Sequence, residues 1–359
     1  MKNIFIALTL FLSIISAKAQ NDTTVKPLKI SGYLEAYYCY DFANPSDHNR
    51  PDFLYSYNRH NEINFNLAFL KASYEKNYIR TNLGLMIGTY PSVNLSSEPG
   101  VLKNIYEANV GFKLSKSKNI WIDAGVFASH IGFESAIGKD CWNLTRSILA
   151  ENSPYYESGI KLSYATKNEK WFISCLLLNG WQHIQPVKGN KTPAFGHQLT
   201  FKPNSKVSFN SSSFVGNNKP DSISRIRYFH NFYGQVQIHK KVGVIIGFDT
   251  GMEQKAKDKS EYNVWYSPVL IVKYSLSKKL NIGMRGEYYS DKYQVIIATG
   301  TPNGFQTYGY SLNIDYSIVE NIIWRLEGRG FESKDAIFSE NDNVTRQNKF
   351  VATSLAIVF

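Results

Sequence analysis

The stretch Val351-Ala352-Thr353-Ser354-Leu355-Ala356-Ile357-Val358-Phe359 indicates the fold class of this 359-residue chain. Successive residues of a β-strand face opposite sides, so one face of this stretch carries the larger side chains and ends on an aromatic ring. The residues of that face are Val351, Thr353, Leu355, Ile357 and Phe359. After the N-terminus, no segment reads as a helix that could cover such a face, so we expect lipid to cover it.

Working back from this stretch, similar alternation recurs in about sixteen segments, which predicts an all-β fold, a transmembrane antiparallel β-barrel. Short and long connections alternate between them, as expected for turns on one side of an outer membrane and loops on the other. About fourteen or eighteen strands remain alternatives, as does a secreted β-sandwich or propeller. The predicted strands are 30–42, 63–74, 78–89, 105–114, 120–130, 156–166, 170–179, 194–202, 206–215, 225–239, 242–253, 265–274, 280–290, 305–317, 321–331 and 348–359.

The N-terminus indicates export. Lys2 precedes an apolar run from Ile4 to Ile15, and Ala17-Lys18-Ala19 has the small residues of a signal-peptide cleavage site. We therefore expect a signal peptide over 1–19, a short periplasmic leader over 20–29 and the barrel over 30–359. The aromatic content of 14%, with tyrosines near strand ends, fits the aromatic girdles of such barrels.

Charged residues that alternate with the apolar face are expected to line the lumen. An arginine facing lipid at mid-depth would cost about 2–4 kcal/mol, so the inward assignment is favoured. The expected pore-lining residues are Glu35, Glu107, Asp123, Glu157, Arg225, Arg227, Arg285, Glu287, Arg325, Glu327 and Arg329, with Asp249 on the same face. They could instead form ion pairs that only fill the lumen. Acidic residues dominate the earlier strands and arginines the later ones, so we expect either a transverse field that modestly favours anions or local neutralisation.

The third long connection, residues 131–155, is the expected constriction loop. It carries Glu134, Asp140 and Arg146 beside several small residues, and loops of this length are usually functional or disordered. If the loop folds inward it would narrow the pore, and if it extends outward it would only form part of the outer surface. Phe359 is the expected assembly signal, because it lies on the strand that closes the barrel.

Several spaced motifs stand out along the chain: Arg59 to Ala68, Asp123 to Phe127, Ile131 to Glu134, Asn143 to Ser147, Ser153 to Tyr156, Asn179 to Trp181 and Arg285 to Tyr289. Together these motifs resemble the OmpL-like family of β-barrel porins. The likeness extends from Gly32 onward, and the chain departs from the family pattern at Cys141-Trp142. The resemblance implies an outer-membrane pore without enzymatic activity or cofactor.

Other chemistry is sparse. Three cysteines, Cys39, Cys141 and Cys175, give no legible disulfide pattern, although one bridge is possible, and the histidines lack metal-ligand spacing. His130 with Ser129 or Ser135 is the local candidate for a hydrolase, but alternation turns His130 and Ser129 to opposite faces, so we expect no enzyme, cofactor or metal. The net charge of +11 is spread along the chain and does not predict nucleic-acid binding.

Two functions remain open at this point. The first is an outer-membrane porin for passive diffusion of small hydrophilic solutes, and the alternative is a barrel with a closed lumen whose outer loops bind a partner or surface. The expected partners are outer-membrane lipid and lipopolysaccharide, the barrel assembly machinery and small hydrophilic solutes, with a homo-oligomer possible.

Overall fold

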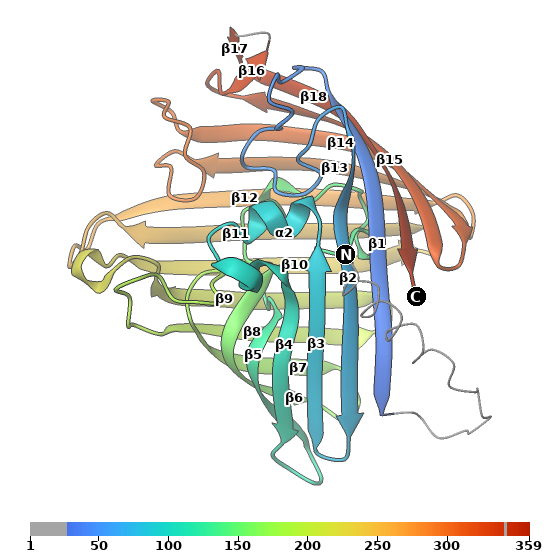
Figure 1. Ribbon diagram of the computed structural model, residues 1–359, viewed down its shortest axis with the longest axis vertical. Coiled ribbons are helices and arrows are strands. Elements are labelled where there is room, and N and C mark those ends of the chain that lie inside the picture. Colours follow the sequence, from blue (N-terminus) through green and yellow to red (C-terminus); the bar gives the residue numbers. More distant parts are fainter. Residues whose placement is uncertain (1–26, 341–342) are drawn as a thin grey trace, which may run out of the picture.

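The computed structural model describes residues 27–340 and 343–359. Sixteen antiparallel strands form a closed barrel in which neighbours in space are neighbours in sequence, as Figure 1 shows. The predicted fold and strand count are thus confirmed, and the predicted signal peptide over 1–19 lies outside the described residues. The barrel strands are β1 Leu28–Asp41, β2 Ile63–Lys76, β3 Ile79–Ile87, β4 Ile105–Lys113, β5 Asn119–Ala128, β6 Tyr156–Ala165, β7 Trp171–Leu178, β8 Ala194–Asn204, β9 Val207–Asn217, β10 Ile226–His239, β11 Val242–Gln254, β12 Tyr262–Ser275, β13 Leu280–Asp291, β14 Phe305–Val319, β15 Ile322–Ser333 and β18 Gln347–Val358.

The outer surface of the barrel is apolar because each strand turns every second side chain outward. Large residues on this face are strongly exposed, as expected of side chains that contact lipid acyl chains. Examples are Leu83, Ile246, Leu270, Leu312 and Leu355. Register irregularities are few, and one lies between Gln237 and His239 in the pairing of β10 with β11.

Eight longer connections lie at one end of the barrel, the loop end, and short turns lie at the other, the turn end. The loops that matter below are loop 1 (42–62), loop 3 (129–155), loop 7 (292–304) and loop 8 (334–346), which contains the hairpin of β16 Phe338–Glu340 and β17 Asn343–Thr345. Helical segments are short: α2 Thr89–Asn94, α3 Ile148–Glu151, η2 Gly100–Asn104, η3 Gly138–Asp140 and η4 Asp221–Ile223. Among the described residues, no helix is long and apolar enough to cross a membrane.

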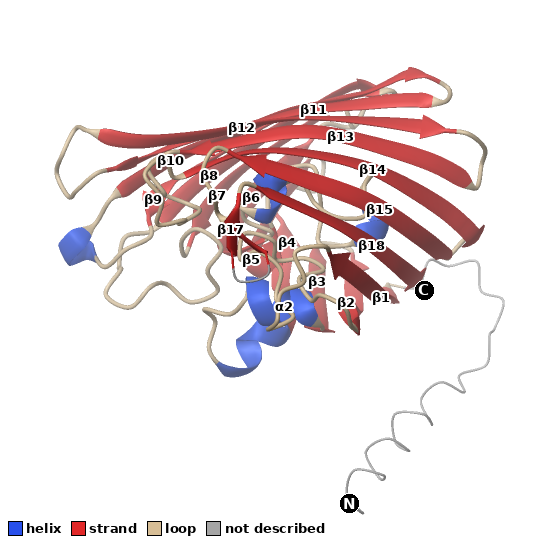
Figure 2. Ribbon diagram, turned by 90° about the horizontal axis from the view of Figure 1, so that it is seen from above, coloured by secondary structure: helices blue, strands red, loops and turns tan. Residues whose placement is uncertain are grey.

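The interior of the barrel contains an apolar cluster. Inward-facing Phe214, Trp265 and Phe331 of the wall join Tyr57 of loop 1 and Leu144 of loop 3 in one group of buried residues. This cluster explains why β7 hardly alternates in sequence: its outward Ile173 and Leu177 meet lipid, and its inward Leu176 and Leu178 join the cluster. Figure 2 shows the long strands β11–β14 along one side and the loops gathered on the other side of that wall.

Candidate functional site

Loop 3 lies inside the barrel, against the inner wall formed by β13–β15. Three inward-facing arginines of this wall donate hydrogen bonds to loop carbonyls. Arg285 Nη1 bonds Thr145 O at 2.7 Å, Arg329 Nη1 bonds Arg146 O at 2.7 Å, and Arg325 Nη2 bonds Cys141 O at 3.0 Å. The arginines are therefore buried between wall and loop, with 0–3% of their surface exposed.

Acidic and amide side chains of the same wall accept hydrogen bonds from the loop backbone. Glu287 Oε2 accepts from Ile148 N at 2.6 Å, and Asn313 Oδ1 accepts from Leu144 N at 3.0 Å. Glu327 Oε2 accepts from Thr145 N. The wall thus satisfies both the donors and the acceptors of the loop, which fixes one docked conformation.

The wall charges also neutralise one another. Arg285 pairs with Glu287 at 3.1 Å and with Glu327 at 3.0 Å. Arg329 also pairs with Glu287, and Arg325 pairs with Asp315 at 2.6 Å. Removing one partner of such a buried pair typically costs about 3–5 kcal/mol, because the other charge stays buried and uncompensated.

The predicted constriction residues lie in different environments. Glu134 and Arg146 are buried and tie loop 3 together: Glu134 Oε2 accepts from Ser147 N at 3.0 Å, and Arg146 Nε donates to Ser135 O at 2.6 Å. Asp140, in η3, is exposed. The first two therefore stabilise the shape of the loop, and only Asp140 offers an open charge.

Loop 1 packs onto loop 3 from the loop end. Its backbone amides at Tyr55 and Ser56 both donate to Glu151 Oε2, at 3.0 and 3.2 Å. Tyr57 Oη donates to Glu35 Oε2 at 2.9 Å, so a predicted lumen carboxylate holds this loop. Sequence reasoning missed these roles of Tyr57, Glu151, Thr145 and Asn313. Only the alternation of polar residues along β14 could have indicated Asn313.

The remaining predicted lumen residues are spread around the wall. Glu107 pairs with Lys71 at 2.6 Å and Asp123 lies against Arg80, both facing a chamber near the turn end. Arg227 pairs with Glu253 at 2.7 Å. The others do not join these groups: Glu157 is buried on β6, Asp249 accepts from Asn231, and Arg225 lies half-buried just before β10.

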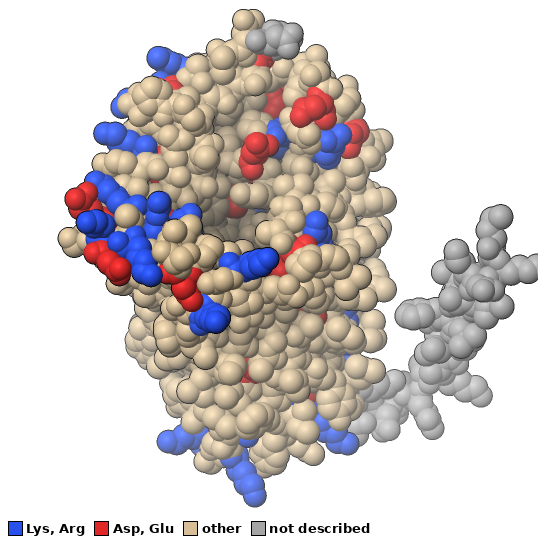
Figure 3. All heavy atoms as spheres, turned by 60° about the vertical axis from the view of Figure 1, so that its left-hand side comes forward, with Lys and Arg blue, Asp and Glu red and all other residues tan. Residues whose placement is uncertain are grey.

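Cavities lie on both sides of the docked loop. One, at the loop end, is the outer pocket of about 540 Å³ between loops 1, 7 and 8. Three others, of about 220, 400 and 470 Å³, continue toward the turn end and share lining residues such as Glu107 and Tyr233. The outer pocket shares no described lining residue with these three, and Figure 3 shows a hollow at the loop end with acidic and basic side chains around it.

Other chemistry is limited within residues 27–340 and 343–359. No group of three or more His, Cys, Asp or Glu side chains could hold a metal ion there, and Cys39, Cys141 and Cys175 are free. The candidate hydrolase pair does not form: His130 Nε2 bonds the carbonyl of Ser213 at 2.8 Å, and Ser129 Oγ accepts from Ile131 N.

Glu151 makes the packing of loops 1 and 3 depend on pH. Burial raises the pKa of its carboxyl to about 7, despite Arg146 and Arg329 nearby. This pKa lies above the ordinary 4.5, so the protonated form of Glu151 stabilises the packed loops. The stabilisation is full below about pH 4.5 and is lost as the pH rises through about 7. The free energy of packing changes by at most about 3 kcal/mol over this range. We expect loop 1 amides, corrected for intrinsic rates, to be better protected from hydrogen exchange at pH 5.5 than at pH 8.5.

Glu151→Gln is expected to flatten this pH dependence. The matched control is Glu261→Gln, which changes an exposed carboxylate of another loop. Equal protection at both pH values in the unmodified protein would show that Glu151 does not control the packing.

Comparisons with known proteins agree with this architecture. The family model "Putative beta-barrel porin-2, OmpL-like" matches residues 27–359. No curated protein sequence matches the chain.

Solved structures share the fold at low sequence identity. An anion-selective porin from Comamonas acidovorans has a TM-score of 0.61 at 9% identity, covering 92% of this chain and 99% of that one. The outer-membrane channel DcaP of Acinetobacter baumannii has a TM-score of 0.60 at 10% identity, covering 92% and 97%. OmpT of Vibrio cholerae, in its trimer form, has a TM-score of 0.57 at 9% identity, covering 92% and 99%.

Proposed function

We propose, because the chain belongs to the OmpL-like family of β-barrel porins, that it forms a water-filled channel for passive diffusion of small hydrophilic solutes across the outer membrane. The observation that carries this proposal is the closed barrel with polar cavities on both sides of an inward-folded loop. A barrel of sixteen strands is too wide for wall side chains alone to fill.

The proposed path runs past loop 3 into the chamber at the turn end. Lys71, Arg80, Glu107, Asp123 and Lys161 line that chamber, which has a volume of about 400 Å³. Charges of both signs suit polar solutes without demanding one sign of charge. We assign loop 3 as the constriction, with Glu134 and Arg146 setting its shape and Asp140 facing solvent.

Porins are typically non-enzymatic channels, and we propose no reaction and no cofactor for this protein. Its proposed partners are outer-membrane lipid around the barrel, lipopolysaccharide at the outer rim, the assembly machinery during insertion and the solutes themselves. The trimer form of the Vibrio cholerae protein motivates a homo-oligomer as a further proposal.

The apolar interior favours a second candidate function. Loops 1 and 3 contribute to the same buried cluster as the wall, so the lumen could stay closed while outer loops bind a partner or surface. Water does not pass readily through a packed apolar constriction, and this makes the two candidates distinguishable by current.

Single-channel recording decides between them. We expect the refolded full-length protein in a planar bilayer to give steady current steps, and liposomes that contain it to swell in small sugars. A folded barrel that stays silent in both assays would contradict the channel and support the closed scaffold.

A further inference from the structure

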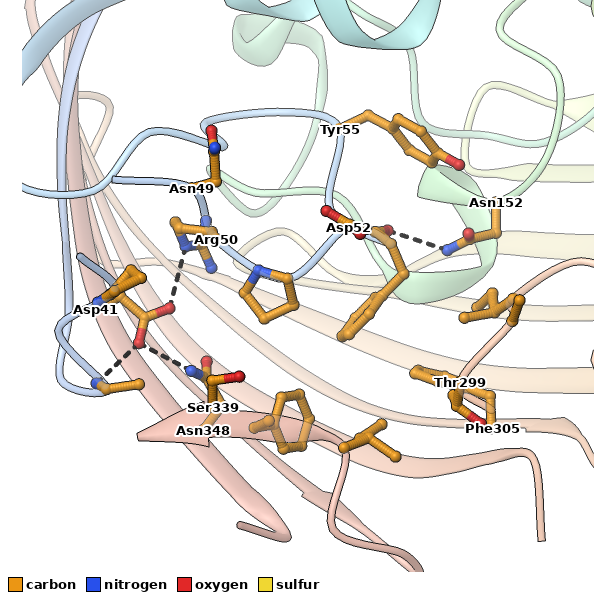
Figure 4. A pocket seen from close by; sticks show the side chains of 18 of the residues that line it. Asp41, Asn49, Arg50, Asp52, Tyr55, Asn152, Thr299, Phe305, Ser339 and Asn348 are labelled. Atoms are coloured by element: carbon orange, nitrogen blue, oxygen red, sulfur yellow. Dashed lines mark hydrogen bonds and ion pairs between the residues drawn. The ribbon is translucent and has the colours of Figure 1, made fainter. Parts of the chain in front are cut away.

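We propose that the outer pocket is a binding site for a neutral saccharide at the mouth of the barrel. Figure 4 shows Asp41, Arg50 and Asn348 on one side of this pocket and Asn152 and Thr299 on the other. Its volume, about 540 Å³, falls within the roughly 300–1,000 Å³ typical of small-molecule sites. This inference extends the proposed channel function and rests on it for the class of solute.

The first argument is a set of buried polar atoms without hydrogen-bond partners. Arg50, Asp41 and Asn348 are 3%, 1% and 4% exposed. Within the described residues, Arg50 Nε and Nη2, Asp41 Oδ2 and Asn348 Oδ1 have no hydrogen-bond partner, and Arg50 Nε and Asp41 Oδ2 meet only in an ion pair at 3.6 Å. Leaving such atoms unpaired costs about 1–3 kcal/mol each, so a ligand that pairs with them gains affinity.

The remaining atoms of these side chains are firmly held. Asn348 Nδ2 donates to Asp41 Oδ1 at 2.8 Å, and Arg50 Nη1 donates to Tyr57 O at 3.0 Å. The Arg50 guanidinium also lies 3.6 Å above the ring of Phe350. The side chains that carry the atoms without hydrogen bonds are thus held in place before a ligand binds.

The pattern of free atoms favours hydroxyl groups. Arg50 presents donors beside the acceptors of Asp41 and Asn348, and a hydroxyl group can accept from the first and donate to the others. A carboxylate or phosphate only accepts, and an ammonium group only donates. Neighbouring hydroxyl groups of a sugar therefore match the set better than a singly charged group.

The charges and the apolar surface of the pocket also favour a neutral saccharide. The Arg50–Asp41 pair, with atoms 3.6 Å apart, is neutral as a unit, and Asp47 and Asp52 add negative charge to the lining, which disfavours anions. Rings of Phe53, Phe305 and Phe338 also line the pocket. Aromatic faces carry partial negative charge and suit the C–H face of a sugar ring.

Calorimetry on the folded full-length protein in detergent tests the site. Maltose and sucrose serve as neutral saccharides, glucose 6-phosphate as an anion and glycylglycine as a zwitterion. We expect saturable binding of at least one disaccharide, and at least about tenfold weaker affinity in Arg50→Gln, equivalent to about 1.4 kcal/mol. Arg346→Gln, which changes an exposed arginine of loop 8 outside the pocket lining, is the matched control and should bind normally.

A second variant protects the test against misfolding of Arg50→Gln. Ala298→Trp fills the pocket from an exposed position without touching the buried pair, and should abolish binding, whereas Ala256→Trp in another loop should not. Absence of saccharide binding, binding of the zwitterion alone, or binding unaffected by Ala298→Trp would overturn the proposal. Conductance without saccharide binding would contradict only the saccharide site. Saccharide binding without conductance would contradict only the proposed channel.

Discussion

Releasing loop 3 from the inner wall is expected to raise single-channel conductance and to admit larger sugars. The variant is Arg285→Gln with Arg329→Gln, which removes two donors to loop carbonyls and leaves Glu287 and Glu327 without their pairs. Breaking even one such buried pair at about 3 kcal/mol shifts the docking equilibrium on the order of 100-fold toward the released loop. Current steps and swelling rates with sugars of increasing size are the measurements.

Two further proteins make this experiment specific. A deletion from Gly132 to Asn152, rejoined through a short glycine linker, should reproduce the larger conductance, because it removes the loop without altering the wall. Arg346→Gln removes an exposed arginine outside the lumen and should conduct like the parent protein. Unchanged conductance in correctly folded released and deleted proteins would mean that another segment limits the pore.

The same arginines are expected to affect the ion selectivity of the channel. Replacing Arg285, Arg325 and Arg329 by glutamine should move the reversal potential in a salt gradient toward cation selectivity, because Glu287, Glu327 and Asp315 would lose their neutralising partners. An unshifted reversal potential in an open, folded variant would identify the arginines as structural partners that do not line the ion path. In the parent protein loop 3 covers these arginines, and the triple variant exposes the wall carboxylates to the lumen because it also releases the loop.

Local sequence patterns predicted the strands of the barrel but not the contacts inside it. Alternation is a property of neighbouring residues, so all sixteen predicted stretches overlap barrel strands, with ends displaced by a few residues. The roles of Tyr57 and Glu151 depend on which loop meets which wall, and nothing near them in sequence specifies that contact. The inward orientation of the aromatic residues could not be predicted either, because a Phe that faces a packed interior and one that faces lipid look alike in sequence.

The ring of Phe359 is expected to determine whether the barrel closes. Phe359 N donates to Gly32 O at 3.0 Å, and Gly32 N donates to Phe359 O at 2.8 Å, at the seam between the last strand and the first. The ring covers Gly32, where a β-carbon would overlap it. Deleting Phe359 removes both hydrogen bonds, worth about 1 kcal/mol each, and leaves part of two strand edges open.

We therefore expect the protein without Phe359 to accumulate in the periplasm, as measured by cell fractionation and heat-modifiable migration. Gly32→Val tests the ring contact with Phe359 present, because the new side chain must displace the ring, and it should also impair assembly. Phe232→Ala is the control, since it removes a comparable lipid-facing ring from the middle of the wall. Normal outer-membrane levels of the truncated protein would show that the paired edges of β1 and β18 suffice for closure without the terminal ring.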